Sequence, residues 1–133
     1  MIAVDTSALL AILFREPDEP RFRAEIASAD GVIMSSVSLL EAGLVLRARH
    51  GQSAVETLGE LIEDTGIMVV EFDRVQADLA IDAFGRFGKG LNPAGLNFGD
   101  CAVYALAKHF GVALLFKGLD FAATDISSTS RSP

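Results

Sequence analysis

The chain has 133 residues, a length that predicts one compact domain. Hydrophobic residues make up 50% of it, and its single cysteine, Cys101, excludes an internal disulfide, which fits a reducing cytosol. The formal net charge of −7 excludes a broad basic surface that holds nucleic acid through its phosphates, unless divalent cations supply the missing positive charge.

The first half of the chain alternates short apolar runs with segments of helical character. Thr6 and Ser7 follow the opening apolar run and are expected to cap a helix. In chain order, the expected elements are a strand at residues 2–4, a helix at 6–14, a polar helix ending near residue 29, a strand at 32–34, and helices at 36–50 and 53–66.

The second half continues this alternation. Residues 67–70 are rich in valine and isoleucine, which favours a strand at the centre of the sheet. The remaining expected elements are a strand at 67–70, a helix from Asp73 to about residue 84, a mobile glycine-rich loop at 85–97, a helix at 98–110, a strand at 113–116 and a short fifth strand around Ile126. We assign residues 1–126 to one domain and residues 127–133 to a frayed polar tail.

Strands that alternate with helices predict an α/β fold, with a central, mostly parallel sheet covered on both faces. Ligands of such sheets bind outside the carboxyl ends of the strands. Asp5 directly follows the first predicted strand, and Asp120 comes shortly after the strand that ends at Phe116. Both carboxylates are therefore expected at the same edge of the sheet.

Two further carboxylates lie on predicted helices among apolar residues. Glu41 shares a helical face with Val37, Leu44 and Val45, and Asp100 repeats the pattern in its own helix. Burying a carboxylate in an apolar stripe costs free energy unless the group is paired or bound to a metal ion. Both acids are expected to point inward.

Each acid also has a plain structural role to weigh. Asp5 could cap a helix, Asp100 could stabilise a first helical turn, and Asp120 could be a turn residue. Glu41 could pair with a basic side chain from elsewhere in the fold. The group is more informative than its members, because two strand ends and two inward helical faces could converge on one crevice.

Carboxylates held that close together cannot all stay ionised without a counter-ion. An oxygen-only cluster selects Mg²⁺ or Mn²⁺ rather than zinc. Such a site could hold a phosphodiester, lower the pKa of a bound water and stabilise in-line displacement. Both histidines, His50 and His109, lie at predicted helix ends and are expected to be structural, and neither a nucleophile elbow nor a phosphate-binding loop occurs in the sequence.

Four segments resemble, in order, the motifs of VapC-type PIN-domain ribonucleases, the toxins of type II toxin–antitoxin systems. These segments are residues 2–10, 35–41, 96–101 and 115–121, and together they span nearly the whole chain. The resemblance implies a PIN-like three-layer α/β/α fold. It also implies that one or two Mg²⁺ or Mn²⁺ ions are held by Asp5, Glu41, Asp100 and Asp120.

The resemblance leaves two residue roles open. Thr6 or Ser7 would position Asp5 or a metal-bound water. The fourth motif often has Asn or Asp where this chain has Leu119, so Asp125 could share or replace the role of Asp120 as a metal ligand.

The resemblance further implies RNA as the substrate, a cognate VapB-like antitoxin as the inhibitor, and a homodimer. The apolar start of the chain lacks the features of a signal peptide, and no run approaches the ~18 apolar residues that a membrane span needs. We therefore expect a cytoplasmic protein that does not bind membranes. The sequence does not indicate which RNA is cut.

Three alternatives remain at this stage. A haloacid-dehalogenase phosphatase would need a second aspartate where this chain has Ser7. A receiver domain could use Lys117, but Asp5 lacks the acidic neighbour that such a domain requires. An inactive binding module that keeps the fold is disfavoured because all four motif acids are present.

Overall fold

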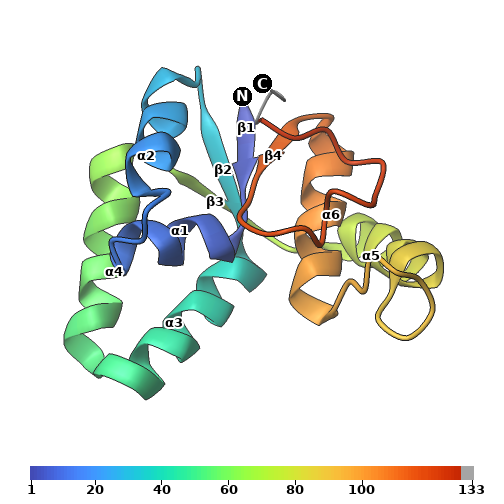
Figure 1. The fold of residues 1–133 in the computed structure, drawn as a ribbon, viewed down its shortest axis with the longest axis horizontal. Coiled ribbons are helices and arrows are strands. Elements are labelled where there is room, and N and C mark those ends of the chain that lie inside the picture. Colours follow the sequence, from blue (N-terminus) through green and yellow to red (C-terminus); the bar gives the residue numbers. More distant parts are fainter. Residues whose placement is uncertain (130–133) are drawn as a thin grey trace.

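A sheet of four parallel strands forms the centre of the molecule (Figure 1). The structure is a computed structural model that describes residues 1–129. The strands are β1 (Ile2–Val4), β2 (Val32–Ser35), β3 (Met68–Val70) and β4 (Ala113–Leu115), in the spatial order β3-β2-β1-β4. The chain builds outward from β1 to β3 and then returns to the other side of β1. Ligands of α/β sheets bind at such a reversal of strand order, here between β1 and β4.

Helices cover both faces of the sheet, so the predicted three-layer α/β/α fold is confirmed (Figure 1). One layer contains α1 (Thr6–Leu13), α2 (Glu19–Ser28), α3 (Ser36–His50) and α4 (Gln52–Thr65). The other contains α5 (Arg74–Phe87) and α6 (Phe98–Phe110). Among residues 1–129, no helix has the length and apolar character that crossing a membrane requires.

Two hydrophobic cores lie on opposite faces of the sheet, because successive side chains of a strand point to opposite sides. In β2, Met34 packs into the core shared with α1 to α4, whereas Ile33 packs into the core shared with α5 and α6. In β4, Leu115 and Leu114 divide between the two cores in the same way. Burial of each such side chain contributes about 1.5–3 kcal/mol, so the cores fix the register of the strands and the position of their ends.

Side-chain caps fix where several helices begin. Asp5 caps α1, Ser35 caps α3 and Asp73 caps α5. Helix α6 begins with a capping box, in which the side chains of Asn97 and Asp100 each accept a hydrogen bond from the other residue's backbone N–H. Two of these caps include predicted site residues, so the start of each of these helices also sets the position of a carboxylate.

The predicted position of the third strand within the sheet is wrong. β3 lies at the edge rather than at the centre, and Met68 and Val69 are exposed. Its β-branched residues reflect the preference for a strand, which does not distinguish an edge strand from a central one. Helix α5 also continues to Phe87 instead of ending near residue 84, so the following loop is shorter than predicted.

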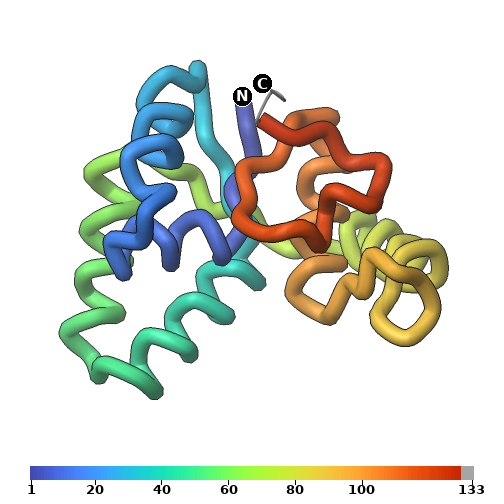
Figure 2. The backbone as a smooth tube through the Cα atoms, in the orientation of Figure 1, coloured from blue at the N-terminus to red at the C-terminus, as the bar shows by residue number. Residues whose placement is uncertain are grey.

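The segment after β4 pairs with the sheet differently from the prediction. No strand forms around Ile126 in the part of the chain that is described. Instead, the backbone of Leu114 donates to the carbonyl oxygen of Ser127 over 2.8 Å and accepts from the N–H of Thr129 over 3.1 Å. The beginning of the predicted tail is therefore bonded to β4 rather than frayed, and residues 130–133 lie outside the described residues. Figure 2 follows this red segment from β4 back toward the N-terminus.

Candidate metal centre

Asp5 lies at the carboxyl end of β1, where its backbone N–H donates to the carbonyl oxygen of Leu115 in β4 over 2.9 Å. Only 6% of the residue is exposed. Burial is the main cause that raises the pKa of Asp5 to about 6, and the negative charges of Asp100 and Glu41 raise it further, against the hydrogen bonds from Ser7. A buried carboxylate repelled by other acids is one that a bound cation would stabilise.

Ser7 fixes the orientation of the Asp5 carboxylate. Its backbone N–H and its hydroxyl donate to Oδ2 of Asp5 over 3.1 and 2.6 Å. The same hydroxyl accepts from the backbone N–H of Lys117 over 2.9 Å, which ties the segment after β4 to the end of β1. Thr6, the other candidate for this role, donates instead to the carbonyl oxygen of Ser38 in α3 over 3.4 Å.

Glu41 reaches the site from α3, across the contact with α6. Its carboxylate lies against Gly99, where an added β-carbon would come within 2.9 Å of Cδ of Glu41. A side chain at position 99 would therefore displace the carboxylate. The predicted apolar stripe around Glu41 is wrong in one respect, because Leu44 is 60% exposed. The residues that α3 buries are Ser38, Ala42 and Leu46.

Asp100 lies in the first turn of α6 and is half-buried. Its Oδ2 accepts from the backbone N–H of Asn97 over 3.1 Å, and its own N–H donates to Oδ1 of Asn97 over 2.9 Å. Burial is the main cause that raises the pKa of Asp100, and the charges of Asp120 and Glu41 add to it. Asp100 therefore does stabilise the first turn of α6, which was the alternative role considered for it. The same residue also lies near other acids.

Asp120 lies on the exposed turn that follows β4, and its charge acts on Asp100. The charge of Glu41 also raises the pKa of Asp100, and the charges of Asp100 and Glu41 both raise the pKa of Asp5. Carboxylates from four separate segments near the carboxyl edge of the sheet thus influence one another electrostatically.

Asp125 does not belong to this group. One of its carboxylate oxygens accepts from the hydroxyl of Tyr104 over 2.5 Å, and the other lies 3.3 Å from Arg86 and 3.1 Å from Lys108. These donors lower the pKa of Asp125 to about 2, with the bond from Tyr104 as the main cause. These contacts favour Asp120 over Asp125 as the fourth ligand, because both oxygens of Asp125 are engaged by protein donors.

The chemistry of the four acids fits a hard divalent cation. They offer carboxylate oxygens alone, which Mg²⁺ and Mn²⁺ prefer, and burial together with the charges of Asp100 and Glu41 disfavours the ionised form of Asp5 unless a cation is bound. Within residues 1–129, no three side chains of Asp, Glu, His or Cys are grouped so that they could hold one ion as they stand. Ligation would therefore require rotation of some of these side chains.

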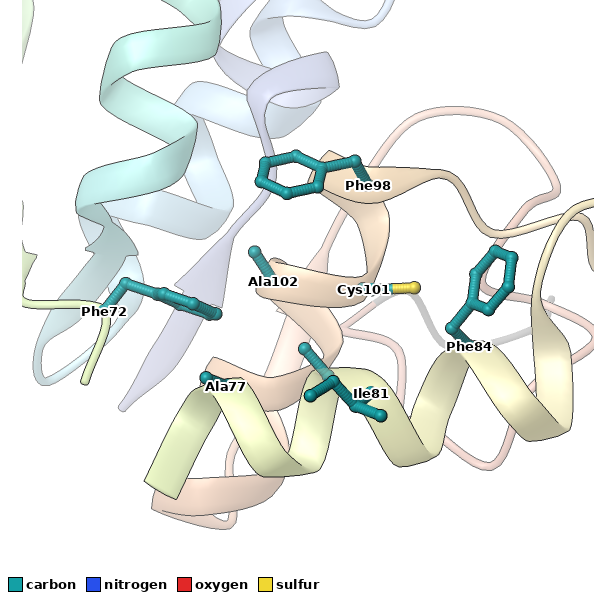
Figure 3. Close-up of a pocket in the computed structure, with 8 residues that line it drawn as sticks. Phe72, Ala77, Ile81, Phe84, Phe98, Cys101 and Ala102 are labelled. Carbon is teal, nitrogen blue, oxygen red and sulfur yellow. The ribbon is translucent and has the colours of Figure 1, made fainter. Parts of the chain in front are cut away.

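A separate apolar pocket lies between α5 and α6 (Figure 3). Its walls are formed by Phe72, Ala77, Ala80, Ile81, Phe84, Phe98, Cys101 and Ala102. Cys101 is 5% exposed, in agreement with the buried position expected for a structural cysteine. The lining carries no acid, so this pocket is not the candidate metal centre.

Two contributions to the site were missed at the level of sequence. The Asn97-x-x-Asp100 spacing is a capping-box pattern that could have been recognised. The contact between Gly99 and Glu41 joins residues far apart in the chain, and no local pattern indicates it. The histidines, by contrast, lie outside the site as predicted, with His50 packed against Phe14 at a centroid distance of 5.5 Å.

The family assignment follows from comparison with known proteins. A profile of the PIN domain matches residues 2–127, nearly the whole chain. The chain belongs to the PIN-domain family. The resemblance of its motifs predicted this family, and the match over residues 2–127 shows it.

Within the PIN-domain family, the chain is similar to VapC ribonucleases. It is 43% identical to ribonuclease VapC30 of Mycobacterium tuberculosis over 129 residues, which cover 97% of this chain and 98% of VapC30. It is 42% identical to ribonuclease VapC of Mycolicibacterium smegmatis, over 96% of this chain and 98% of that protein. The recognition of a VapC-type PIN-domain protein is therefore confirmed.

Solved structures agree with the fold. The sarcin-ricin loop cleaving toxin VapC20 of M. tuberculosis superposes with a TM-score of 0.80 at 20% identity, covering 98% of this chain and all of that one. The VapBC2 structure from Rickettsia felis, bound to a promoter DNA fragment, gives a TM-score of 0.71 at 12% identity, over 96% of both chains.

The structure also weakens the phosphatase and receiver alternatives. Ser7 occupies the position where a phosphatase of the haloacid-dehalogenase type needs its acid–base aspartate, and it orients Asp5 instead. The amino group of Lys117 lies 2.7 Å from Glu16 and 3.6 Å from Asp18, rather than beside the acids at the sheet edge.

Proposed function

We propose that Asp5, Glu41, Asp100 and Asp120 hold Mg²⁺ or Mn²⁺ and that this site hydrolyses RNA phosphodiesters. Membership of the VapC ribonucleases supports the activity class, an endoribonuclease toxin neutralised by an antitoxin. The observation that carries the site assignment is the burial of Asp5 among other acids, which raises its pKa to about 6. A dication is the partner that makes such a group stable in its ionised form.

The residues at the site have different roles in holding the cation and orienting its ligands. A bound divalent cation would neutralise the carboxylates and supply the Lewis acidity that activates water and stabilises the phosphorane-like charge. Ser7 engages Oδ2 of Asp5 and leaves Oδ1 available as a ligand. Asn97 likewise engages Oδ2 of Asp100, and the absence of a side chain at Gly99 leaves room for the Glu41 carboxylate between α3 and α6. Hydrolysis by an activated water forms no covalent intermediate with the enzyme.

The negative charge of the chain determines how RNA is held. A chain with a net charge of −7 has little basic surface with which to neutralise phosphates. We infer that the cation provides the main electrostatic attraction for the scissile phosphate. Specificity would then depend on the shape and the loops of the RNA rather than on its charge.

The antitoxin is expected to mask the acidic site. The structural neighbours include a toxin–antitoxin complex from Klebsiella pneumoniae and FitAB bound to a DNA fragment. We infer that a cognate VapB-like antitoxin brings a basic side chain to the acids of this chain and an apolar segment to a groove on its helices. Growth arrest on expression of the chain alone, relieved by the product of an adjacent small gene, would support the antitoxin proposal.

We also propose that the chain acts as a homodimer in the cytoplasm.

The proposed function is tested by RNA cleavage with purified protein. Wild-type chain should cut RNA in Mg²⁺ or Mn²⁺ and not in EDTA, and Asp100→Asn should abolish cleavage while the protein stays folded. Mg²⁺ should also raise the melting temperature of the wild type, since binding at ten times Kd adds about 1.4 kcal/mol to the free energy of unfolding. Full cleavage by a well-folded Asp100→Asn protein would refute the site assignment.

A further inference from the structure

The segment that carries Asp120 follows β4 and ends where Ser127 bonds to the backbone of Leu114. It consists of turns and contains no helix or strand. Phe121 anchors one point of it, because this side chain is 2% exposed and packs against Phe116 with ring centroids 5.2 Å apart. Asp120 itself is exposed. Its position relative to Asp100 therefore depends on how its neighbours in the segment are held.

A cluster of four polar side chains holds the far end of this segment. We call it the Asp125 clasp, and it consists of Asp125, Tyr104, Arg86 and Lys108. The hydroxyl of Tyr104 donates to Oδ1 of Asp125 over 2.5 Å, while Arg86 and Lys108 lie 3.3 and 3.1 Å from Oδ2. Both carboxylate oxygens are thus engaged, by donors on α5 and α6.

On α6, the clasp residue Tyr104 is buried. Tyr104 is 2% exposed, and its ring packs against Phe87 with centroids 5.7 Å apart. The pKa of Asp125 falls to about 2, mainly through the bond from Tyr104 and also through Lys108 and Arg86. The three donors therefore favour the ionised form of Asp125, the form that can accept from all of them.

Helix geometry connects the clasp to the candidate metal centre. Tyr104 follows Asp100 by four residues on α6, so the two side chains lie on the same face of the helix, one turn apart. By binding Tyr104, Asp125 attaches its segment to the face of α6 that bears Asp100. Asp125 lies only five positions after Asp120, and the charge of Asp120 contributes to the raised pKa of Asp100.

We propose that Asp125 is a positioning residue, which binds no cation itself and holds Asp120 beside Asp100 through the Tyr104 hydroxyl. This inference rests on the proposed function, because it assumes that Asp120 helps to hold the cation. Its main effect is on geometry and not on stability, since the side chain of Asp125 is 43% exposed and exposed ion pairs stabilise little.

The test compares Asp125→Asn and Tyr104→Phe with the wild type. The first removes the charge at nearly constant size, and the second removes only the hydroxyl. Each should raise, roughly ten-fold, the Mg²⁺ concentration at half-maximal cleavage and at half-maximal increase in melting temperature, as loss of a residue that orients a metal ligand does elsewhere. The rate at saturating Mg²⁺ and the melting temperature in EDTA should be largely retained.

The matched control is Asp82→Asn. Asp82 lies on the exposed side of α5 and is the other carboxylate near Arg86, at 3.8 Å, but it is not part of the segment that carries Asp120. Both Mg²⁺ midpoints should therefore be unchanged in this variant. A shift as large as that of Asp125→Asn would overturn the proposal, because it would assign the effect to Arg86 or to general charge.

A double substitution separates positioning from a direct role. In an Asp120→Asn background, Asp125→Asn should add no further shift in the Mg²⁺ midpoint for melting, because the residue that it positions is already lost. A full additional shift, or unchanged midpoints in both single variants, would overturn the proposal. If the wild type shows neither Mg²⁺-dependent melting nor cleavage, the proposed function fails and this inference fails with it.

Discussion

Asp5 shows that the arrangement of the site has a cost in stability. Its pKa rises from 3.8 to about 6 in the folded chain, chiefly because the carboxyl is buried. Between these two pH values the folded chain holds a proton that the unfolded chain has released. The free energy of unfolding contributed by this group therefore falls as the pH rises through that window. At neutral pH the ionised carboxylate destabilises the fold unless a cation is bound.

Asp5→Asn should consequently raise the melting temperature at pH 7 in EDTA. Asparagine keeps an acceptor for Ser7 and removes the buried charge, and the gain in free energy of unfolding should be about 1–3 kcal/mol. At pH 5, where the folded carboxyl of Asp5 is mostly protonated but the unfolded one is still ionised, the gain should be about half as large. Thermal melts at both pH values check this. A variant that melts below the wild type at pH 7 would show that the hydrogen bonds outweigh the charge.

Gly99→Ala should impair cleavage with little effect on stability. The added methyl group would overlap the carboxylate of Glu41, which is the flexible end of a side chain and can move away without disturbing the backbone. Gly43→Ala on α3 is the matched control, since nothing lies within 4 Å of its added carbon. Cleavage rates at limiting Mg²⁺ should fall for Gly99→Ala alone. Equal rates for both variants would mean that the position of Glu41 does not matter.

At the scale of the element, α6 combines a structural role with a chemical one. Seven of its residues from Cys101 to Ala107 are buried, so the helix is firmly packed against the sheet and α5. Its first turn carries Asp100, and the cap that begins the helix also fixes the backbone of that residue. Loss of this cap should therefore affect both stability and metal binding.

Asn97→Ala and Asp73→Ala form a matched pair that tests this coupling. Each removes a side-chain cap, from α6 and from α5, whose bond to the backbone is 2.9 Å long. Each should lower the free energy of unfolding by about 1 kcal/mol. Asn97→Ala alone should also raise the Mg²⁺ requirement for cleavage, measured by titration. The same increase in Asp73→Ala would indicate a general loss of stability instead.

The sequence was informative about elements wherever their signals are local. The span of α3, between Ser35 and Gly51, matches the prediction because a cap and a glycine mark its ends. The place of β3 at the sheet edge could not be predicted, because valine favours central and edge strands alike. The bonding of Ser127 and Thr129 to β4 depends on tertiary contacts that no short pattern encodes.

The candidate site was predictable to a similar degree. The acids at the ends of β1 and β4 follow from the topology of parallel strands, and the structure places Asp5 and Asp120 at that edge. The partners of Asp125 come from α5 and α6, and the approach of Arg86 and Tyr104 to a residue more than twenty positions away has no sequence signature. For that reason Asp125 resembled a ligand in the sequence and is an ion-pair partner in the structure.

At the scale of the whole molecule, the net negative charge predicts how strongly RNA binding depends on salt concentration. A nuclease that holds RNA with six phosphate contacts loses about 10³-fold in affinity between roughly 50 and 200 mM salt. This chain, with a net charge of −7, should show a far weaker dependence at saturating Mg²⁺. Measurement of KM for a short RNA across this range checks it. A steep increase in KM would mean that a basic surface, rather than the cation, holds the RNA.

The order of strands in the sheet has a consequence for the cell that makes this protein. β1 is synthesised first, yet β4, one of its two neighbours, comes after α6. A nascent chain that has been translated through α5 contains Asp5 and Glu41 but neither Asp100 nor Asp120. Because domains fold as units during translation, a ribosome building this enzyme is exposed to no competent nuclease until synthesis has passed β4. The topology thus delays assembly of the four carboxylates until β4 and the segment after it have been synthesised.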